Sequence, residues 1–239
     1  MFRKLSRYVK PGGLLFITFL PPIGAISTYL RRLISYRFIN KKDKLTHKTN
    51  ILKSIFSNHL NKLKSMSRTH DHWIQDSLLN PYIVVGYNTP YISIKNLGKR
   101  FEIFNSVPKL STDWRWYKSL YGKKKIFNKI YLDEYYSTCH CLINYKINGF
   151  SRCKKKNKLL EDLSIKLSLL TKDYETKGFK AYKNKIKPIL RKIINNIRFD
   201  LPEQTVKALK EVDKVLSKKN LKIKDLKLMK EFPNLFGRE

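Results

Sequence analysis

The chain has 239 residues, of which 42% are hydrophobic and 13% aromatic, and this excludes a purely disordered basic tail. Its 51 Lys and Arg against 18 Asp and Glu give a formal charge of +33, more than internal ion pairs can compensate. A polyanionic partner is expected, because a phosphate backbone would neutralise the excess charge and release its condensed counterions.

The positive charge is spread along the chain. It amounts to +13 over residues 1–64, +1 over 65–113, +10 over 114–158 and +9 over 159–239. A+T-rich codon usage would explain the preference for Lys over Arg, but it does not explain why Asp and Glu are scarce. The distribution therefore predicts several basic surfaces around one nearly neutral block.

Residues 12–30 form a run without any charged side chain. The run is close to the ~20 residues that a bilayer span requires, and basic residues before it give it the polarity of a signal peptide. Pro21 and Pro22 interrupt it, which disfavours a continuous helix. We expect an extended N-terminal arm that leads into a buried helix over 23–38, with a membrane contact through residues 12–30 as the alternative.

Next, residues 43–64 have the apolar period of an amphipathic helix whose other face is cationic. The neutral block contains three segments with the composition of strands. Residues 82–87, 91–94 and 100–107 are rich in β-branched and aromatic side chains and are separated by turn signals. We expect these three segments to form a small antiparallel sheet. Residues 141–148 are a further candidate strand.

From Thr112 to Tyr136 the chain is again helical and aromatic in pattern, and beyond Lys158 every segment has a helical apolar period. Asp200 is a candidate N-cap, followed by Pro202 and Glu203 as first-turn residues. The helices expected in this last part cover 159–170, 179–197 and 203–216.

The predicted fold is therefore α+β and helix-rich, with a small antiparallel sheet in the middle flanked by basic amphipathic helices. We expect three regions: the arm and basic helix over 1–64, a central α+β core over 65–158, and a basic helical region over 159–239.

Two groups of residues could bind a metal. In His70-Asp71-His72, two imidazoles could share an ion on an extended strand, but no third ligand follows at a recognisable spacing. We favour solvated histidines at the start of a helix over 73–79, with Asp71 near its N-terminus.

The second group contains Cys139, His140, Cys141 and Cys153. Zinc ligands usually lie two to four residues apart, so a C-x-C pair is tight for a tetrahedral ion. We expect no metal and no cofactor, and we interpret the cysteines as small buried apolar residues in a reducing compartment. The sequence also contains no phosphate-binding glycine loop, and its paired carboxylates are sequence neighbours that would diverge on a helix. We do not expect an enzyme.

Basic residues among aromatic ones are the strongest functional signal. Around Trp114 and Trp116, aromatic rings could stack on unpaired bases or equally could pack in the core. Residues 177–198 hold eight basic residues and no acid, which suggests that another molecule supplies the compensating charge. The candidate RNA-binding residues are Arg31, Arg32, Arg37, Arg115, Lys118, Lys123, Lys124, Lys125, Arg152, Lys154, Lys155, Lys156, Lys180, Lys183, Lys185, Lys187, Arg191 and Lys192.

These patterns predict a structural RNA-binding component of a large ribonucleoprotein. The composition resembles that of mitochondrial ribosomal proteins encoded by A+T-rich genomes, which implies contacts with rRNA and neighbouring ribosomal proteins in the mitochondrial matrix. The alternative is an accessory subunit of an organellar inner-membrane complex, anchored by residues 12–30. A maturase or nuclease remnant would need a cluster of metal-binding carboxylates, which the sequence lacks.

Overall fold

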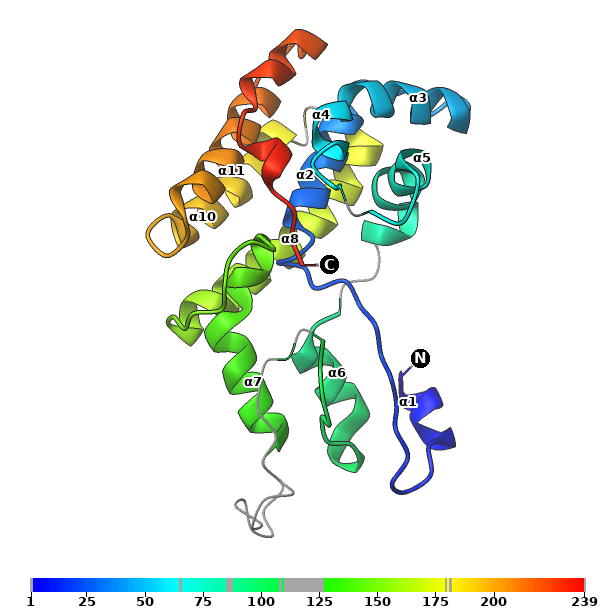
Figure 1. Ribbon diagram of the computed structural model, residues 1–239, viewed down its shortest axis with the longest axis vertical. Coiled ribbons are helices and arrows are strands. Elements are labelled where there is room, and N and C mark those ends of the chain that lie inside the picture. Colours follow the sequence, from blue (N-terminus) through cyan, green and yellow to red (C-terminus); the bar gives the residue numbers. More distant parts are fainter. Residues whose placement is uncertain are drawn as a thin grey trace.

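The computed structural model describes residues 2–64, 66–84, 88–107, 109, 127–178, 180 and 182–238. Helix accounts for 64% of the structure, and no β-strand occurs in these ranges (Figure 1). The predicted α+β class with a central antiparallel sheet is therefore wrong, and the fold is all-helical.

The expected strand over 91–94 lies inside helix α6 (Pro90–Leu97). The Thr89 hydroxyl accepts a hydrogen bond from the Ile92 N–H at 3.2 Å and so caps the helix. Pro90 occupies the first turn, where its missing N–H is not needed. These two N-terminal signals outweigh the preference of Tyr91, Ile92 and Ile94 for strands.

The segment over 100–107 is mostly extended but pairs with no strand. The side chain of Asn128, in α7 (Phe127–Thr138), accepts from the Ile103 N–H at 2.8 Å and donates to the Phe101 carbonyl at 2.9 Å. The apolar residues of this segment predicted a strand, but its backbone groups bind the Asn128 side chain and no neighbouring strand is present among the described residues.

The two other segments expected to be strands also contain no strand where the structure describes them. Residues 81–84 form a 3-10 helix, η3 (Pro81–Val84), and the rest of the 82–87 segment lies outside the described residues. The segment over 141–148 begins within another 3-10 helix, η5 (Cys139–Ile143), and continues as turn.

The core is built around α2 (Ile26–Ser35), and every residue of this helix is buried. This confirms the buried helix expected within 23–38, although the helix is shorter than predicted. Its main partner is the long helix α8 (Lys154–Lys177), which also packs against α7 and α10 (Lys187–Ile197). A helix that is buried on all sides must satisfy its polar side chains internally.

Short helices cover one side of α2. The amphipathic helix expected over 43–64 is divided into α3 (Leu45–Ile55) and α4 (Ser57–Leu60). After them, α5 (His70–Ile74) continues directly into a π-helical turn, η2 (Gln75–Leu79).

The predicted C-terminal helices are confirmed as α8, as a π-helical turn η6 (Tyr182–Ile186) continuing into α10, and as α11 (Glu203–Leu216). Gly178 ends α8 with φ of 74°, a conformation that favours glycine. Asp200 is not an N-cap, because α11 begins after Pro202 and the Asp200 carboxylate instead binds Arg152 at 2.9 Å. Two 3-10 helices follow, η7 (Ile223–Leu228) and η8 (Phe232–Asn234).

The N-terminal arm begins with α1 (Phe2–Leu5) and η1 (Ser6–Tyr8), turns, and then runs extended to the start of α2 (Figure 1). The expected extended arm is confirmed over residues 13–20. Within the described parts of the chain, no helix is both long enough and apolar enough to cross a membrane.

The C-terminal segment returns to the core and crosses the start of α2. Arg238 N–H donates to the Leu142 carbonyl at 2.9 Å, and Tyr145 N–H donates to the Phe236 carbonyl at 2.9 Å. At the crossing, a Cβ on Gly237 would overlap the backbone carbonyl of Gly24. Only glycine therefore fits at this point.

Candidate nucleic-acid interface

Three segments that are distant in the sequence meet at one end of the molecule, the upper end in Figure 1. Residues 36–44 follow α2, residues 172–185 include the end of α8, and residues 213–227 include the end of α11. The Arg37 guanidinium joins the first segment to the third by donating to the Lys219 carbonyl at 2.6 Å. We call these three segments the basic end.

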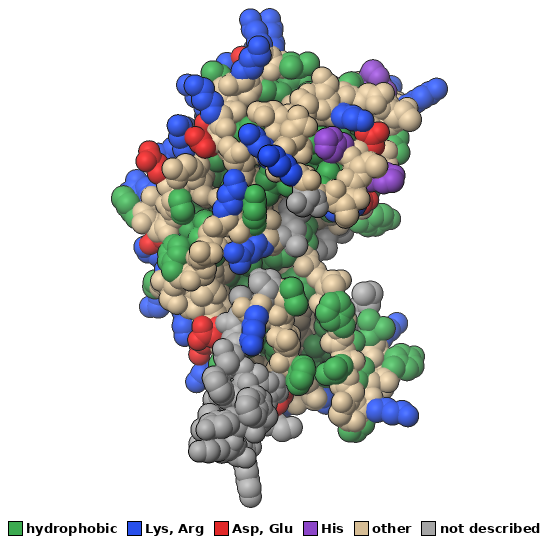
Figure 2. All heavy atoms as spheres, viewed as in Figure 1, with side chains coloured by type: hydrophobic (Ala, Val, Ile, Leu, Met, Phe, Trp, Pro, Cys, Tyr) green, Lys and Arg blue, Asp and Glu red, His purple; other side chains and the backbone are tan. Residues whose placement is uncertain are grey.

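The second and third segments are joined by a hydrogen bond between side chains. The Tyr182 hydroxyl donates to the Asp213 carboxylate at 3.0 Å. Together the basic end holds fifteen Lys and Arg against five Asp and Glu. Figure 2 shows Lys and Arg side chains projecting from this end. Because α2, α8 and α11 all point their C-terminal ends here, their helix dipoles favour the nearby cations.

The carboxylates of the basic end are mostly engaged by internal partners. Glu175 pairs with the buried Arg32 at 2.8 Å, and Asp225 pairs with Lys218 at 2.7 Å. Asp213 pairs with Arg191 at 3.2 Å, and Asp173 with Lys177 at 3.4 Å. The exposed lysines of the basic end that pair with no carboxylate among the described residues are Lys42, Lys44, Lys172, Lys180, Lys183, Lys185, Lys214, Lys219, Lys222, Lys224 and Lys227.

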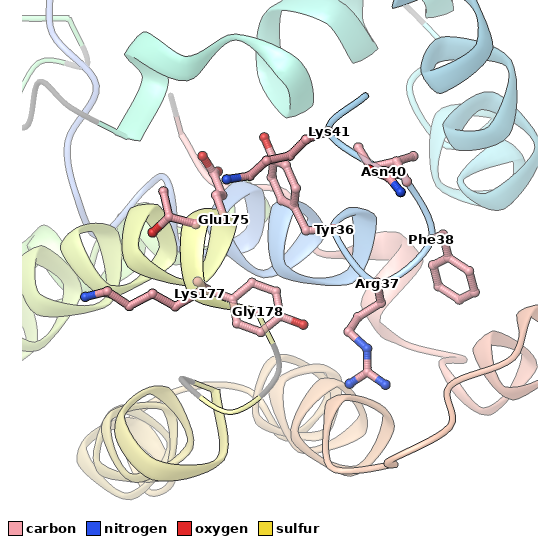
Figure 3. Close-up of a pocket in the computed structure, with 11 residues that line it drawn as sticks. Tyr36, Arg37, Phe38, Asn40, Lys41, Glu175, Lys177 and Gly178 are labelled. Atoms are coloured by element: carbon pink, nitrogen blue, oxygen red, sulfur yellow. The ribbon is translucent and has the colours of Figure 1, made fainter. Parts of the chain in front are cut away.

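A pocket of about 540 Å³ lies within the basic end, between residues 36–41 and residues 174–178. Figure 3 shows the side chains of Tyr36, Lys41 and Glu175 pointing toward one another, while Arg37 extends away from them. Burial raises the pKa of Tyr36 to about 12, so its hydroxyl remains protonated at neutral pH. Glu175 is already engaged by Arg32, and Lys41 is an exposed cation of the lining that suits phosphate oxygens.

Arg31 and Arg32, expected to contact RNA, are fully buried in the core. The Arg31 guanidinium lies 4.1 Å from the ring centroid of Phe236 and donates to the Leu235 carbonyl at 2.7 Å. Arg32 donates to the Asn80 carbonyl at 2.9 Å as well as to Glu175. Both arginines therefore act as internal connectors, and a phosphate would not reach them at the surface.

Arg152 is also an internal connector, with a side chain only 4% exposed. It donates to Asn157 at 2.6 Å and to Asp200 at 2.9 Å, and thereby joins the start of α8 to the end of α10. Of the lysines that follow it, Lys154 pairs with Asp133 at 2.9 Å, Lys156 pairs with Asp200 at 3.3 Å, and Lys155 is exposed.

The basic run over 177–198 lies partly in the basic end. Lys180, Lys183, Lys185 and Lys192 are exposed, and Lys187 is partly buried. The compensating charge expected from another molecule is supplied in part by this chain, because Asp213 pairs with Arg191 and Asp173 with Lys177. The remaining candidates lie outside the described residues: Arg115, Lys118, Lys123, Lys124 and Lys125, together with the expected stacking rings of Trp114 and Trp116.

Apart from Arg37, the basic residues that follow α2 and α11 were not among the predicted site residues. Lys41 and Lys42 lie beside the pocket segment, and residues 218–227 bring five lysines to the same end. The local density of lysine in K-K-N-L-K-I-K-D-L-K was a visible signal. The sequence does not reveal that this segment lies beside residues 36–44, because their proximity depends on how α2 and α11 pack.

No three His, Cys, Asp or Glu side chains are placed to share a metal within the described ranges. His70 begins α5, and the Thr69 hydroxyl caps that helix by accepting from the His72 N–H at 3.3 Å. This agrees with the favoured interpretation of the histidines.

The cysteines differ from one another in exposure. Cys139 and Cys141 are buried, as expected, and Cys153 is exposed. Burial lowers the pKa of His140 to about 4, with a smaller contribution from Arg152. The His140 ring is therefore neutral at pH 7, and its Nδ1 lies 3.2 Å from the Asn157 amide nitrogen.

Comparisons with protein-family models, with curated proteins and with solved structures gave no match to this chain.

Proposed function

We propose that the protein is a structural RNA-binding component of a large ribonucleoprotein and that it holds RNA phosphates at its basic end. One observation carries this proposal: three distant segments bring fifteen basic residues together, while most of the carboxylates among them are engaged within the protein. A surface of this kind gains from phosphate neutralisation and counterion release.

In its most specific form, the proposal places the protein in a mitochondrial ribosome, where it would contact rRNA and neighbouring ribosomal proteins in the matrix. Its role would be architectural. The basic end supports this role because it is built on the ends of three packed helices, which hold the cations in a fixed arrangement.

The test is RNA binding by the full chain at several salt concentrations. The variant Lys219→Gln/Lys224→Gln/Lys227→Gln removes three exposed cations of the basic end. The matched control, Lys62→Gln/Lys64→Gln/Lys129→Gln, removes three exposed cations elsewhere. We expect the first variant to lower the slope of log K against log salt by about 2 to 3, since each phosphate contact contributes about 0.7 to 0.9.

The control should leave most of that slope in place. An affinity independent of salt, or equal slopes for the two variants, would contradict the assignment of the basic end. Sedimentation of the endogenous protein in an organelle lysate, with and without nuclease, tests the particle. Co-sedimentation with a ribosomal subunit that nuclease abolishes is the expected result.

A further inference from the structure

The end of the molecule opposite the basic end carries exposed apolar side chains. Tyr8 and Phe16 are each 85% exposed, and Leu14 is 75% exposed. They flank the turn between η1 and the extended arm, at the lower end in Figure 1. With Leu5, which is 44% exposed, these residues form a cluster that we call the apolar tip.

The exposure of the tip follows from the conformation of the arm. In an extended chain, successive side chains point to opposite sides. Leu15 and Ile17 are partly buried, whereas Leu14, Phe16 and Thr18 alternate with them and are exposed. One side of the arm therefore packs on the protein, and the other presents large apolar groups to the outside.

The neighbouring helix extends this surface. Helix α1 packs against α6, on which Tyr91 is 49% exposed. Figure 2 shows hydrophobic side chains gathered over the arm and α6, on the lower right of the view. Contiguous apolar surface of this kind marks a site of contact with a protein or a membrane.

The charged residues that neighbour the apolar tip in the sequence are all positive. Lys4, Arg7 and Lys10 are exposed, and no Asp or Glu occurs before Asp43. A surface that combines exposed Leu, Phe and Tyr with Lys and Arg is complementary to a bilayer that contains anionic lipid. Stacked bases would match Tyr8 and Phe16 but would gain little from Leu5 and Leu14.

We propose that the apolar tip docks on an anionic membrane surface. Tyr8, Leu14 and Phe16 insert at the boundary between headgroups and acyl chains, and Lys4, Arg7 and Lys10 contact the headgroup phosphates. The arm lies on the bilayer and does not span it. Docking at this end leaves the basic end pointing away from the membrane, where it remains free to hold RNA.

The test is flotation of the full chain with vesicles of phosphatidylcholine, with and without phosphatidylglycerol. We expect Leu14→Ser/Phe16→Ser to weaken binding to the anionic vesicles at least tenfold. Phe199→Ser is the matched control, because Phe199 is 82% exposed, follows a basic residue and lies away from the tip. This control should change binding less than twofold.

A second pair of variants tests the charge. Arg7→Gln/Lys10→Gln should weaken binding only to the anionic vesicles, since each cation near such a surface contributes about fivefold. Lys219→Gln/Lys224→Gln/Lys227→Gln should retain the vesicle binding and lose RNA affinity instead. This contrast separates the membrane proposal from the proposed RNA function.

Three outcomes would overturn the membrane proposal. The first is failure of the unmodified chain to float with anionic vesicles. The second is a loss of RNA affinity in Leu14→Ser/Phe16→Ser, which would make the tip part of the RNA surface. The third is a self-associated form, seen by sedimentation, that the same variant abolishes without any effect on vesicle binding.

Discussion

The Arg32 guanidinium and the Glu175 carboxylate form a salt bridge of 2.8 Å that joins the central helix α2 to α8. Arg32 is fully buried, and the Glu175 side chain is 12% exposed. Arg32 also binds backbone carbonyls at the end of η2, including that of Asn80 at 2.9 Å. One buried cation thus connects three elements, and its hydrogen bonds offset the cost of removing it from water.

Removal of Arg32 is expected to destabilise the fold strongly. In Arg32→Ala, Glu175 would lose its buried counterion, and the carbonyls of η2 would lose their donors. We expect a loss of about 3 to 5 kcal/mol in the free energy of unfolding, measured by urea denaturation. The control Lys62→Ala removes an exposed cation and should change this free energy by less than about 0.5 kcal/mol. Equal effects would contradict a connecting role for Arg32.

Stability is expected to fall with acidification through the burial of His140. Burial lowers the pKa of this imidazole to about 4, whereas the unfolded chain titrates near its ordinary value of 6.5. Between these two values the unfolded state binds more protons, so the His140 contribution is present above pH 6.5 and is lost as the pH falls toward 4. From pH 7 to pH 5 the loss from this group is about 2 kcal/mol.

Urea unfolding of His140→Gln at the two pH values isolates this contribution. The variant should lose less stability than the unmodified chain between pH 7 and pH 5. His47→Gln, which changes an exposed histidine of α3, should retain the full dependence. Identical pH profiles for His140→Gln and the unmodified chain would show that the His140 pKa is the same in the folded and unfolded states.

Alanine substitution is expected to destabilise the fold at Gly237 but not at Gly149, because only Gly237 lies at the backbone crossing with Gly24. A Cβ on Gly237 would overlap the Gly24 carbonyl, so Gly237→Ala must separate the two segments. We expect a loss of at least about 1 to 3 kcal/mol, as for overpacked sites. Gly149→Ala is the control, because a Cβ there meets no atom within 4 Å. It should be neutral or stabilising by up to about 1 kcal/mol in the same urea titration.

The helices that could be predicted from the sequence are those whose signals are local. Helix α11 was expected over 203–216 and has these bounds, because its apolar period and Pro202 lie within a few residues. The sheet was wrong because β-branched content was given more weight than the N-cap formed by Thr89 and Pro90. The choice between helix and strand for such a segment is decided by capping hydrogen bonds, and the apolar pattern alone does not reveal these bonds.

The basic character of the candidate site could be predicted from the sequence more readily than the placement of its residues. The charge indicates a polyanionic partner, but Arg31, Arg32 and Arg152 were assigned to the surface and lie inside. A buried arginine needs carbonyls, carboxylates or aromatic rings from distant segments, and these are brought to it only by packing. For Arg31 the partner is Leu235, which is 204 positions away. A membrane contact was expected through residues 12–30. The part of this run that lies in α2 is enclosed in the core, so the contact stays a prediction only for the residues of the apolar tip.

The return of the C-terminal segment to α2 has a consequence for synthesis. During translation, α2 is made well before the carbonyl of Leu235 and the ring of Phe236 that receive Arg31, because Leu235 follows Arg31 by 204 positions. Until then, Arg31 lacks the carbonyl and the ring that it contacts in the folded chain. We expect the nascent chain to need protection from premature association until Leu235 and Phe236 have been made and the core can close.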